Sequence, residues 1–425
     1  MKTHQHYVIA SIMMTVAGFA FAQTSPDNVA VPDRAIVLTG GQNGINRQVM
    51  TVLYDTSNTH FQDPQPPRFL LIDREGRTVF GVGGYVNAVA QFDFTGALND
   101  VEFKTYNIPV PGNPAERNRL GADLGRSNIY MMLVTHTRWG VLKAYAKGDF
   151  SDDNYGFRLK QAYVSLHNVT AGLTRSLFQD LQSGFPTIDR KGPSGAISAK
   201  TMQMRYSLNL NKHFSFALSA EIPKVDFTTL NGYNRQIAPR LPDLPAYLQY
   251  QWNEGKSHIR ASALFRQMSY RNLVTNSNKF ATGWAVQLSG ALNFADKVVI
   301  FYQGVYGKGA AQYINDLADE GFDLIYSGRN GDMTAPPMLG LVGGIKSYFS
   351  SKMFMSSAYS LCRLYGQDAL GDDTYRRGNY SITNFFYNPL PELRLGVEFI
   401  HGIRTNMNGI GNSAYRLQTM VQYSF

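Results

Sequence analysis

The chain has 425 residues and a formal net charge of +9, and 44% of its residues are hydrophobic. After residue 22 no apolar run reaches the roughly 20 residues that a membrane-spanning helix needs, which excludes a helical membrane protein. The single cysteine, Cys362, cannot form a disulfide within the chain, and no run of Lys and Arg exceeds two residues, which argues against nucleic-acid binding.

The first residues have the pattern of a secretory signal. Lys2 precedes an apolar run that closes on Ala20-Phe21-Ala22, the small-x-small pattern at which a signal peptidase cuts. An anchor helix is the alternative, but the run is short and polar residues follow at once. We therefore predict a signal peptide at residues 1–22 and export of the rest of the chain.

Residues 23–77 are polar and rich in proline, with one short amphipathic stretch around Ile45, Val49 and Leu53. We expect a periplasmic N-terminal extension here. A poorly ordered leader is equally compatible with this composition.

From Thr78 onward, apolar and polar residues alternate with period two, the pattern of strands that have one apolar face. In the last such segment Leu417, Val421 and Phe425 share the apolar face, and Arg416 lies on the polar one. Sixteen segments can be counted. They are residues 78–95, 126–137, 139–150, 156–167, 169–176, 199–210, 213–222, 244–253, 257–270, 280–294, 297–308, 338–349, 352–365, 376–388, 391–404 and 413–425.

The connections between the segments indicate how these strands are arranged. Seven tight turns alternate with longer polar loops, and an outer-membrane barrel has this asymmetry, with its short turns and both termini in the periplasm. The C-terminal phenylalanine is a common assembly signal of such barrels. We therefore predict an all-β fold, a transmembrane antiparallel up-and-down β-barrel of about 16 strands, formed by residues 78–425 in the outer membrane of a Gram-negative bacterium. A soluble secreted β protein is the alternative. The tight turns are expected at residues 137–138, 168, 210–212, 253–255, 295–296, 350–351 and 389–390.

The third long loop, between the fifth and sixth segments, is the candidate constriction. A barrel of sixteen strands leaves a water-filled interior, and the glycines and prolines of this loop allow it to fold inward and narrow the channel. A loop lying over the mouth is the alternative. The candidate constriction residues are Asp180, Gly184, Pro186, Asp189, Arg190 and Lys191.

Basic residues inside the strands are expected to face the lumen, because Arg or Lys on the lipid face near the bilayer midplane costs about 2–4 kcal/mol. Basic groups on a pore wall favour anions. Near the strand ends this cost falls, and a basic side chain can instead reach the membrane interface. The segment that holds Arg158 and Lys160 looks apolar on both faces, which packing between barrels in an oligomer would explain. The pore-lining candidates are Arg205, Arg260, Arg158, Arg175, Lys160, Arg266, Lys143 and Arg416.

Several stretches, spread in order over residues 79–425, resemble the DcaP-like trimeric outer-membrane porin family. They include GVGGYVNAVAQFDFTG, NYGFRLKQAYVSL, VTAGLTRSLFQD, LQYQWNEGKSHIRASALFRQMSYR, YGKGAAQYINDL and YRLQTMVQYSF. The resemblance implies a homotrimer of sixteen-stranded barrels, each with a channel that favours small anionic solutes such as dicarboxylates. Better-known members begin with a heptad-patterned coiled coil, which residues 23–77 lack. The basic charge of the chain also suits contact with outer-membrane lipids and lipopolysaccharide.

Three other functions compete with a diffusion pore for anions. A barrel hydrolase of the phospholipase or protease type needs a nucleophile within about 3 Å of a base. Ser and His on one strand lie about 7 Å apart or more, although His136 and His401 could reach serines on neighbouring strands. An energised transporter needs about 22 strands and a plug domain. A substrate-specific channel for neutral solutes is the third alternative. No spacing of His, Cys or Asp indicates a metal site, so no cofactor and no catalytic residue is predicted.

Overall fold

The computed structural model describes residues 28–31, 35–39, 44–56, 59–96, 101–229, 232–327, 330–366 and 370–425. The predicted signal peptide, residues 1–22, lies outside these ranges. Within them, no helix has both the length and the apolar character needed to cross a membrane.

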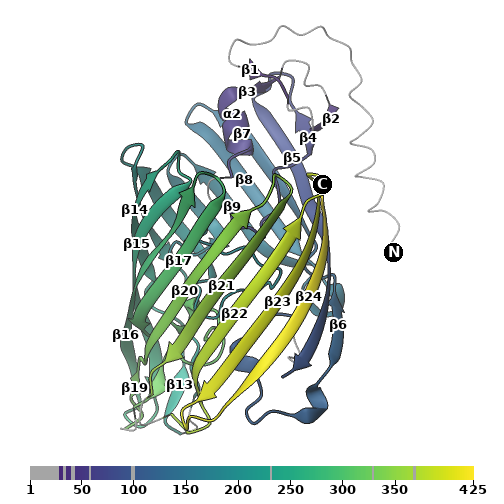
Figure 1. The fold of residues 1–425 in the computed structure, drawn as a ribbon. Helices are drawn as coiled ribbons and strands as arrows, with labels where there is room; N and C mark the ends of the chain where they lie inside the picture. The colour runs from purple at the N-terminus through teal and green to yellow at the C-terminus, as the bar shows by residue number, and fades with distance from the viewer. Residues whose placement is uncertain are drawn as a thin grey trace, which may run out of the picture.

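Sixteen long strands in the described part of the chain close into an antiparallel barrel, with the last strand paired to the first (Figure 1). The predicted fold class is therefore confirmed. The strands are β5(Thr78–Thr95), β7(Asn128–Thr137), β8(Gly140–Asp149), β9(Arg158–Leu166), β10(Val169–Arg175), β11(Lys200–Asn209), β12(Phe214–Glu221), β14(Leu244–Trp252), β15(Ser257–Asn272), β16(Ser277–Phe294), β17(Val298–Lys308), β20(Pro337–Tyr348), β21(Met353–Leu364), β22(Tyr375–Tyr387), β23(Leu393–Asn406) and β24(Gly411–Ser424).

The connections alternate in length less regularly than the sequence predicts. All seven connections at the end that carries the C-terminus are short, as expected for the periplasmic side. At the other end, residues 273–276 and 407–410 are also tight turns, where long loops were expected. The difference arises because β15 and β16 stay paired as far as Asn272 and Ser277, and a four-residue turn with Asn276 at φ 52° then joins them.

The inner and outer faces of the wall follow the predicted alternation. On β11, Met202 and Met204 are 55% and 62% exposed and face outward, whereas Gln203 between them is 6% exposed and faces inward. On β24, Arg416 is 0% exposed and Val421 is 52% exposed. Apolar side chains therefore cover the outer surface that meets lipid, and polar side chains line the interior, as in other membrane barrels.

A β-bulge in β9 changes which side chains point inward. Lys147 of β8 pairs with Gln161, and Gly148 pairs with Leu159, so Lys160 has no partner of its own in the ladder. A bulge of this kind places two successive side chains on one face. Past the bulge the outer face therefore continues on even-numbered positions, with Val164 46% exposed. This bulge explains why the segment looked apolar on both faces, and packing between barrels is not needed to explain the pattern.

The N-terminal segment folds onto the periplasmic end of the barrel, at the top of Figure 1. Its helix α2(Arg47–Leu53) buries Val49 and Leu53, so the amphipathic stretch noted in the sequence is this helix. These side chains pack against Tyr130 and Met132 of β7 in one apolar cluster. Strand β4 pairs with the start of β5, while Phe425 pairs with Gly84 farther along β5. The strands of this segment are β1(Asn28–Val29), β2(Ile36–Thr39), β3(Ile45–Asn46) and β4(Phe69–Ile72).

Short elements occupy the connections at the outer end, and several of them are buried inside the barrel. They are η1(Thr105–Asn107), η2(Pro114–Glu116), β6(Arg119–Asp123), η3(Asp153–Tyr155), β13(Asn234–Gln236), η4(Ala311–Tyr313), β18(Ile325–Tyr326) and β19(Met333–Thr334). The two-stranded pair of β18 and β19 belongs to a loop that folds into the lumen.

Candidate pore and its constriction

Residues 176–199, here called the pore loop, leave the wall after β10 and fold into the interior. Asp180, 1% exposed, accepts hydrogen bonds from His258 Nε2 at 2.8 Å and Ser289 Oγ at 2.7 Å, on β15 and β16. Burial alone would raise the pKa of Asp180, but the Arg260 guanidinium and these two donors hold it below its ordinary value. The ionised carboxylate fixes the first part of the loop to the inner wall.

The tip of the pore loop is bound to another part of the wall. Glu398 of β23 accepts hydrogen bonds from Thr187 Oγ1 at 2.7 Å and from the amide of Asp189 at 2.8 Å. The carbonyl of Pro186 accepts from Ser356 Oγ of β21 at 3.2 Å. Since the loop starts at β10 and contacts β15, β16, β21 and β23, it crosses the lumen.

Asp189, 0% exposed, joins the tip of the pore loop to the first outer loop. Its carboxylate accepts from the amide of Phe103 at 3.1 Å and from Tyr380 Oη at 2.9 Å. Burial raises the pKa of Asp189, although these hydrogen bonds oppose the shift. Gly184 allows a close contact with the N-terminal segment, because a Cβ there would lie 2.4 Å from the ring of His60. The pore loop thus contacts the N-terminal segment at a residue without a side chain.

A second inner loop, residues 309–336, covers the pore loop on its extracellular side. The sequence patterns did not predict this loop. Ile314 forms a bridge with Ile197, and the amide of Asn315 donates to the carbonyl of Ala196 at 3.0 Å. Tyr313 and Phe178 pack edge to face in the same buried cluster. The outer half of the interior is therefore a packed core, and open space is left along part of the wall.

The larger space is a vestibule of about 920 Å³ at the periplasmic end. Helix α2 and the segment after it line one side, strands β8–β12, β14 and β15 line the other, and Leu181 and Gln182 of the pore loop border it. Four of the predicted pore-lining residues contribute to its surface. They are Lys143, Arg175, Arg205 and Arg260.

Arg260 is held rigidly in the vestibule wall. Its Nε donates to Gln249 Oε1 at 2.8 Å, and its guanidinium carbon lies 4.1 Å from the ring centre of Tyr247. Arg205 lies on the inward face of β11 and borders the same space. The orientation predicted for these two arginines from strand alternation is the one the structure has.

A smaller inner cavity of about 80 Å³ lies beyond the vestibule, between the tip of the pore loop and the wall. Arg175 borders both cavities, and the region around it is here called the passage. Of the described residues that line the inner cavity, seven are basic and one, Asp149, is acidic. The basic residues are Arg126, Lys147, Lys160, Arg175, Arg190, Lys200 and Arg394.

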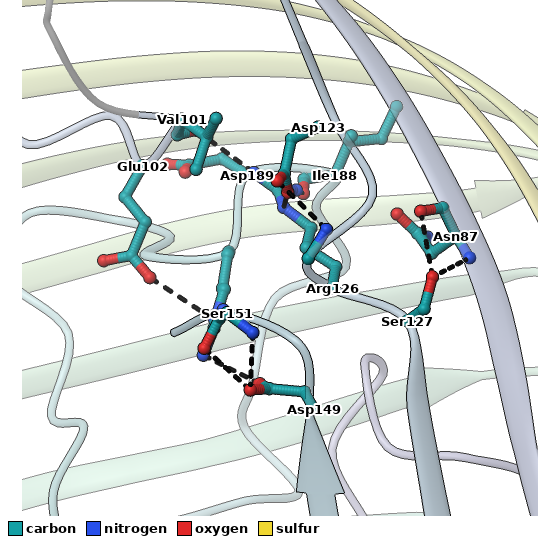
Figure 2. Close-up of polar contacts among 12 residues, drawn as sticks. Asn87, Val101, Glu102, Asp123, Arg126, Ser127, Asp149, Ser151, Ile188 and Asp189 are labelled. Atoms are coloured by element: carbon teal, nitrogen blue, oxygen red, sulfur yellow. Dashed lines mark hydrogen bonds and ion pairs between the residues drawn. The ribbon is translucent and has the colours of Figure 1, made fainter. Parts of the chain in front are cut away.

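Several of these basic side chains hold the pore loop in place. Arg190 lies 2.9 Å from Asp149 and 3.4 Å from Glu102, and Lys160 lies 3.3 Å from the same Asp149 carboxylate. Arg126 donates to the carbonyl of Ile188 and stands beside Asp123 (Figure 2). The Asp149 carboxylate is thus shared by two cations.

Two predicted pore-lining residues are not on the open wall. Arg266 is 0% exposed and is bound by Asp243 at 2.9 Å and Asp323 at 2.8 Å. Arg416 is also 0% exposed, and Asp93 binds it at 2.6 Å. Both side chains point inward as predicted, but acidic groups enclose them, so they are structural ion pairs. Arg158 is exposed at the outer end of β9, away from both cavities.

Four basic residues that line the inner cavity are not among the predicted pore-lining or constriction residues. They are Arg126, Lys147, Lys200 and Arg394. Arg126 begins the predicted segment 126–137 but lies just before β7 in the structure. Lys200 is the first residue of β11, directly after the pore loop. A basic residue directly after an inward-folding loop was a usable sequence signal for Lys200.

A family model described as a porin subfamily matches residues 83–374. The chain belongs to this porin subfamily. Among solved structures, the porin is similar to the outer membrane channel DcaP of Acinetobacter baumannii, with a TM-score of 0.71 and 21% identity over 83% of this chain and 98% of that one. A search among curated protein sequences gives no significant match.

Two further similarities concern the fold of the porin. An anion-selective porin from Comamonas acidovorans aligns with a TM-score of 0.53 and 11% identity, over 82% of this chain and 100% of that one. OmpT of Vibrio cholerae, in a trimer form, aligns with a TM-score of 0.52 and 9% identity over the same shares. Family and fold together make the porin an outer-membrane channel for passive diffusion.

Among the described residues, Ser289, Asp180 and His258 bring the residue types of a hydrolase together, but in the wrong order. Ser289 donates to Asp180, which also accepts from His258, whereas a catalytic serine must donate to the histidine. All three residues are 1% exposed or less, so a substrate could not reach them. Cys362 is buried as well, and the described residues include no group of three or more His, Cys, Asp or Glu placed to hold a metal.

Proposed function

We propose that this porin favours anions, and among them small carboxylates and dicarboxylates. The observation that carries the proposal is the inner cavity, where seven basic side chains and one acidic side chain surround the passage beside the pore loop. A cavity lined by one sign of charge in low-dielectric surroundings concentrates ions of the opposite sign. Narrow width and basic walls together select anions of limited size.

The arrangement also suits a solute with two carboxylates. Arg205 and Arg260 line the vestibule, and Lys160 and Lys200 line the inner cavity, with Arg175 between the two sets. A guanidinium can donate two parallel hydrogen bonds to a carboxylate, and such charge-assisted bonds strengthen where water is scarce. Several moderate contacts along the path let a dicarboxylate enter without being trapped, which conduction requires.

Neutralising two basic side chains of the inner cavity tests this proposal. In the double variant Lys160→Gln, Lys200→Gln, we expect uptake of succinate into proteoliposomes to fall roughly threefold relative to uptake of a neutral pentose, because the local potential weakens. Asp149 stays paired with Arg190 at 2.9 Å, so the variant leaves that carboxylate with a cation.

The matched control removes two lysines from exposed turns outside both cavities, as Lys256→Gln, Lys297→Gln. Its succinate-to-pentose uptake ratio should equal that of the wild type. A parallel fall of succinate and pentose uptake in the cavity variant would indicate a change of pore shape and would remove the support for charge selection.

We further propose that the porin works as a homotrimer surrounded by lipid and lipopolysaccharide. OmpT, which shares the fold, is recorded in a trimer form. An apolar hollow of about 670 Å³ on the lipid-facing surface, over β9–β11, supports contact with a partner barrel. Residues such as Val164 and Tyr206 line this hollow. Exposed basic residues near the outer ends of β17 and β22, Lys308 and Arg376, suit the phosphates of lipopolysaccharide.

A further inference from the structure

Residues 60–65 of the N-terminal segment, here called the plug segment, lie inside the periplasmic end of the barrel. Phe61 packs against Phe386 and Phe354, with ring centres 5.1 and 6.0 Å apart, on the strands that also hold the tip of the pore loop. Gln62 Nε2 donates to the carbonyls of Thr187 and Asp189 at 3.3 and 2.8 Å. The plug segment is thus bound directly to the pore loop.

Two tyrosines of the wall fix the backbone of the plug segment. Tyr85 Oη donates to the carbonyl of Gln62 at 2.9 Å, and Tyr130 Oη donates to that of Gln65 at 2.6 Å. These contacts come from β5 and β7, on a different part of the wall from β21 and β22. A segment held from both sides keeps a defined place at the entrance of the inner cavity, where Phe61 and Gln62 form part of the lining.

The plug segment carries one carboxylate, and this group sits among the basic residues of the passage. Asp63 Oδ1 lies 2.7 Å from Lys147 Nζ and 3.0 Å from Arg175 Nη2, while Oδ2 accepts from the amide of His60 at 2.9 Å. Burial alone would raise the pKa of Asp63, but Arg175 and Lys147 hold it well below its ordinary value. The carboxylate is therefore ionised and satisfies two of the seven basic groups.

His60 adds no charge to the plug segment. Burial and the nearby Arg175 lower its pKa to about 3, so the ring is neutral at physiological pH. The segment thus presents one negative charge, on a short side chain, to a site that otherwise attracts solute anions.

We propose that Asp63 acts as a tethered occupant of the carboxylate-binding site of the pore, and that a permeating carboxylate displaces it from Lys147 and Arg175. The inference rests on the proposed anion channel and adds a residue and a direction to it. A tethered group competes at a high effective concentration, so Asp63 weakens solute binding from the vestibule and prevents an anion from blocking the passage. Since the backbone of the plug segment is held by Tyr85 and Tyr130, displacement needs rotation of the side chain alone.

The test uses the full-length porin in planar bilayers with succinate as the probe. Asp63→Asn keeps the size of the side chain and removes its charge. We expect the succinate concentration that blocks half of the chloride current to fall roughly tenfold. This factor corresponds to a site that Asp63 occupies about 90% of the time in the wild type. The control Glu75→Gln removes one charge from an exposed turn of the N-terminal segment outside the plug segment, where Glu75 contacts Arg77, and should behave as the wild type.

Asp63→Cys separates charge from shape in a barrel that has already folded. The native Cys362 is 0% exposed, so a methanethiosulfonate reagent should modify the introduced cysteine alone. A sulfonate-bearing reagent should restore the wild-type block by succinate, and a trimethylammonium-bearing reagent should not. Equal effects of the two reagents, or an unchanged half-blocking concentration in Asp63→Asn, would overturn the role of Asp63. If the wild type itself shows no anion preference, the proposed function fails instead.

Discussion

At the scale of single residues, the interior of the porin contains two kinds of charged side chain. Asp180 belongs to the first kind, in which a carboxylate with 0% exposed side chain is bound by His258 and Ser289 and faces Arg260 at 3.7 Å. Such groups fix the pore loop to the wall. Lys160 and Lys200 belong to the second kind, which lines the inner cavity.

Asp180→Asn should lower the free energy of unfolding at pH 7 by about 3 kcal/mol, because it removes one member of a buried charged group. The folded pKa of Asp180 is below the ordinary value of 3.8, so its stabilisation is complete above pH 3.8 and is lost as the pH falls through the folded value. The gap between wild type and variant should therefore shrink in acid. Urea titrations of the reconstituted barrel measure it.

The control for that measurement is Asp296→Asn, an exposed turn residue that pairs with Lys256 at 2.9 Å. It should unfold at the wild-type urea concentration. An Asp180→Asn barrel that also unfolds at the wild-type midpoint at pH 7 would show that the carboxylate does not anchor the loop.

Residue patterns predicted the direction of the basic side chains but not their surroundings. Alternation along β15 correctly turned both Arg260 and Arg266 inward. It could not show that Asp323, 57 positions farther along the chain, encloses Arg266. Ion pairs between a strand and a distant loop depend on tertiary contacts, which a strand period does not contain. Open and enclosed arginines therefore look alike in the sequence.

At the scale of elements, loop order together with glycine and proline content singled out the loop between the fifth and sixth predicted segments, while the second inner loop was not predicted. Its buried position depends on the bridge between Ile314 and Ile197, a contact between two loops that no local pattern encodes. The bulge in β9 was equally hidden, because Lys160 looks like an ordinary strand residue until its partners on β8 are known.

Deleting residues 184–195 should raise the single-channel conductance roughly twofold, because it removes the tip of the pore loop and Arg190 from beside the inner cavity. The deletion also removes Asp189, the acceptor for Tyr380, so folding must be checked by heat-dependent migration on gels. A well-folded channel with unchanged conductance would contradict the proposal that this loop narrows the pore.

At the scale of the whole molecule, the barrel wall, the pore loop and the N-terminal segment together line the vestibule and the inner cavity, and Arg175 borders both. The N-terminal segment contributes because α2 and Asp63 border the vestibule. We expect the detergent-extracted protein to be a heat-modifiable trimer whose bilayer conductance rises in groups of three equal steps. Recovery of a water-soluble monomer from the periplasm without detergent would contradict this assembly.

The central claim is that the basic passage selects anions, and the reversal potential of the wild-type channel under a tenfold KCl gradient tests it most directly. Because seven basic residues and one acidic residue surround the inner cavity, we predict a reversal potential with the sign of the chloride equilibrium potential. In Lys160→Gln, Lys200→Gln it should move toward zero. A potential at zero or on the potassium side in the wild-type channel would contradict the account.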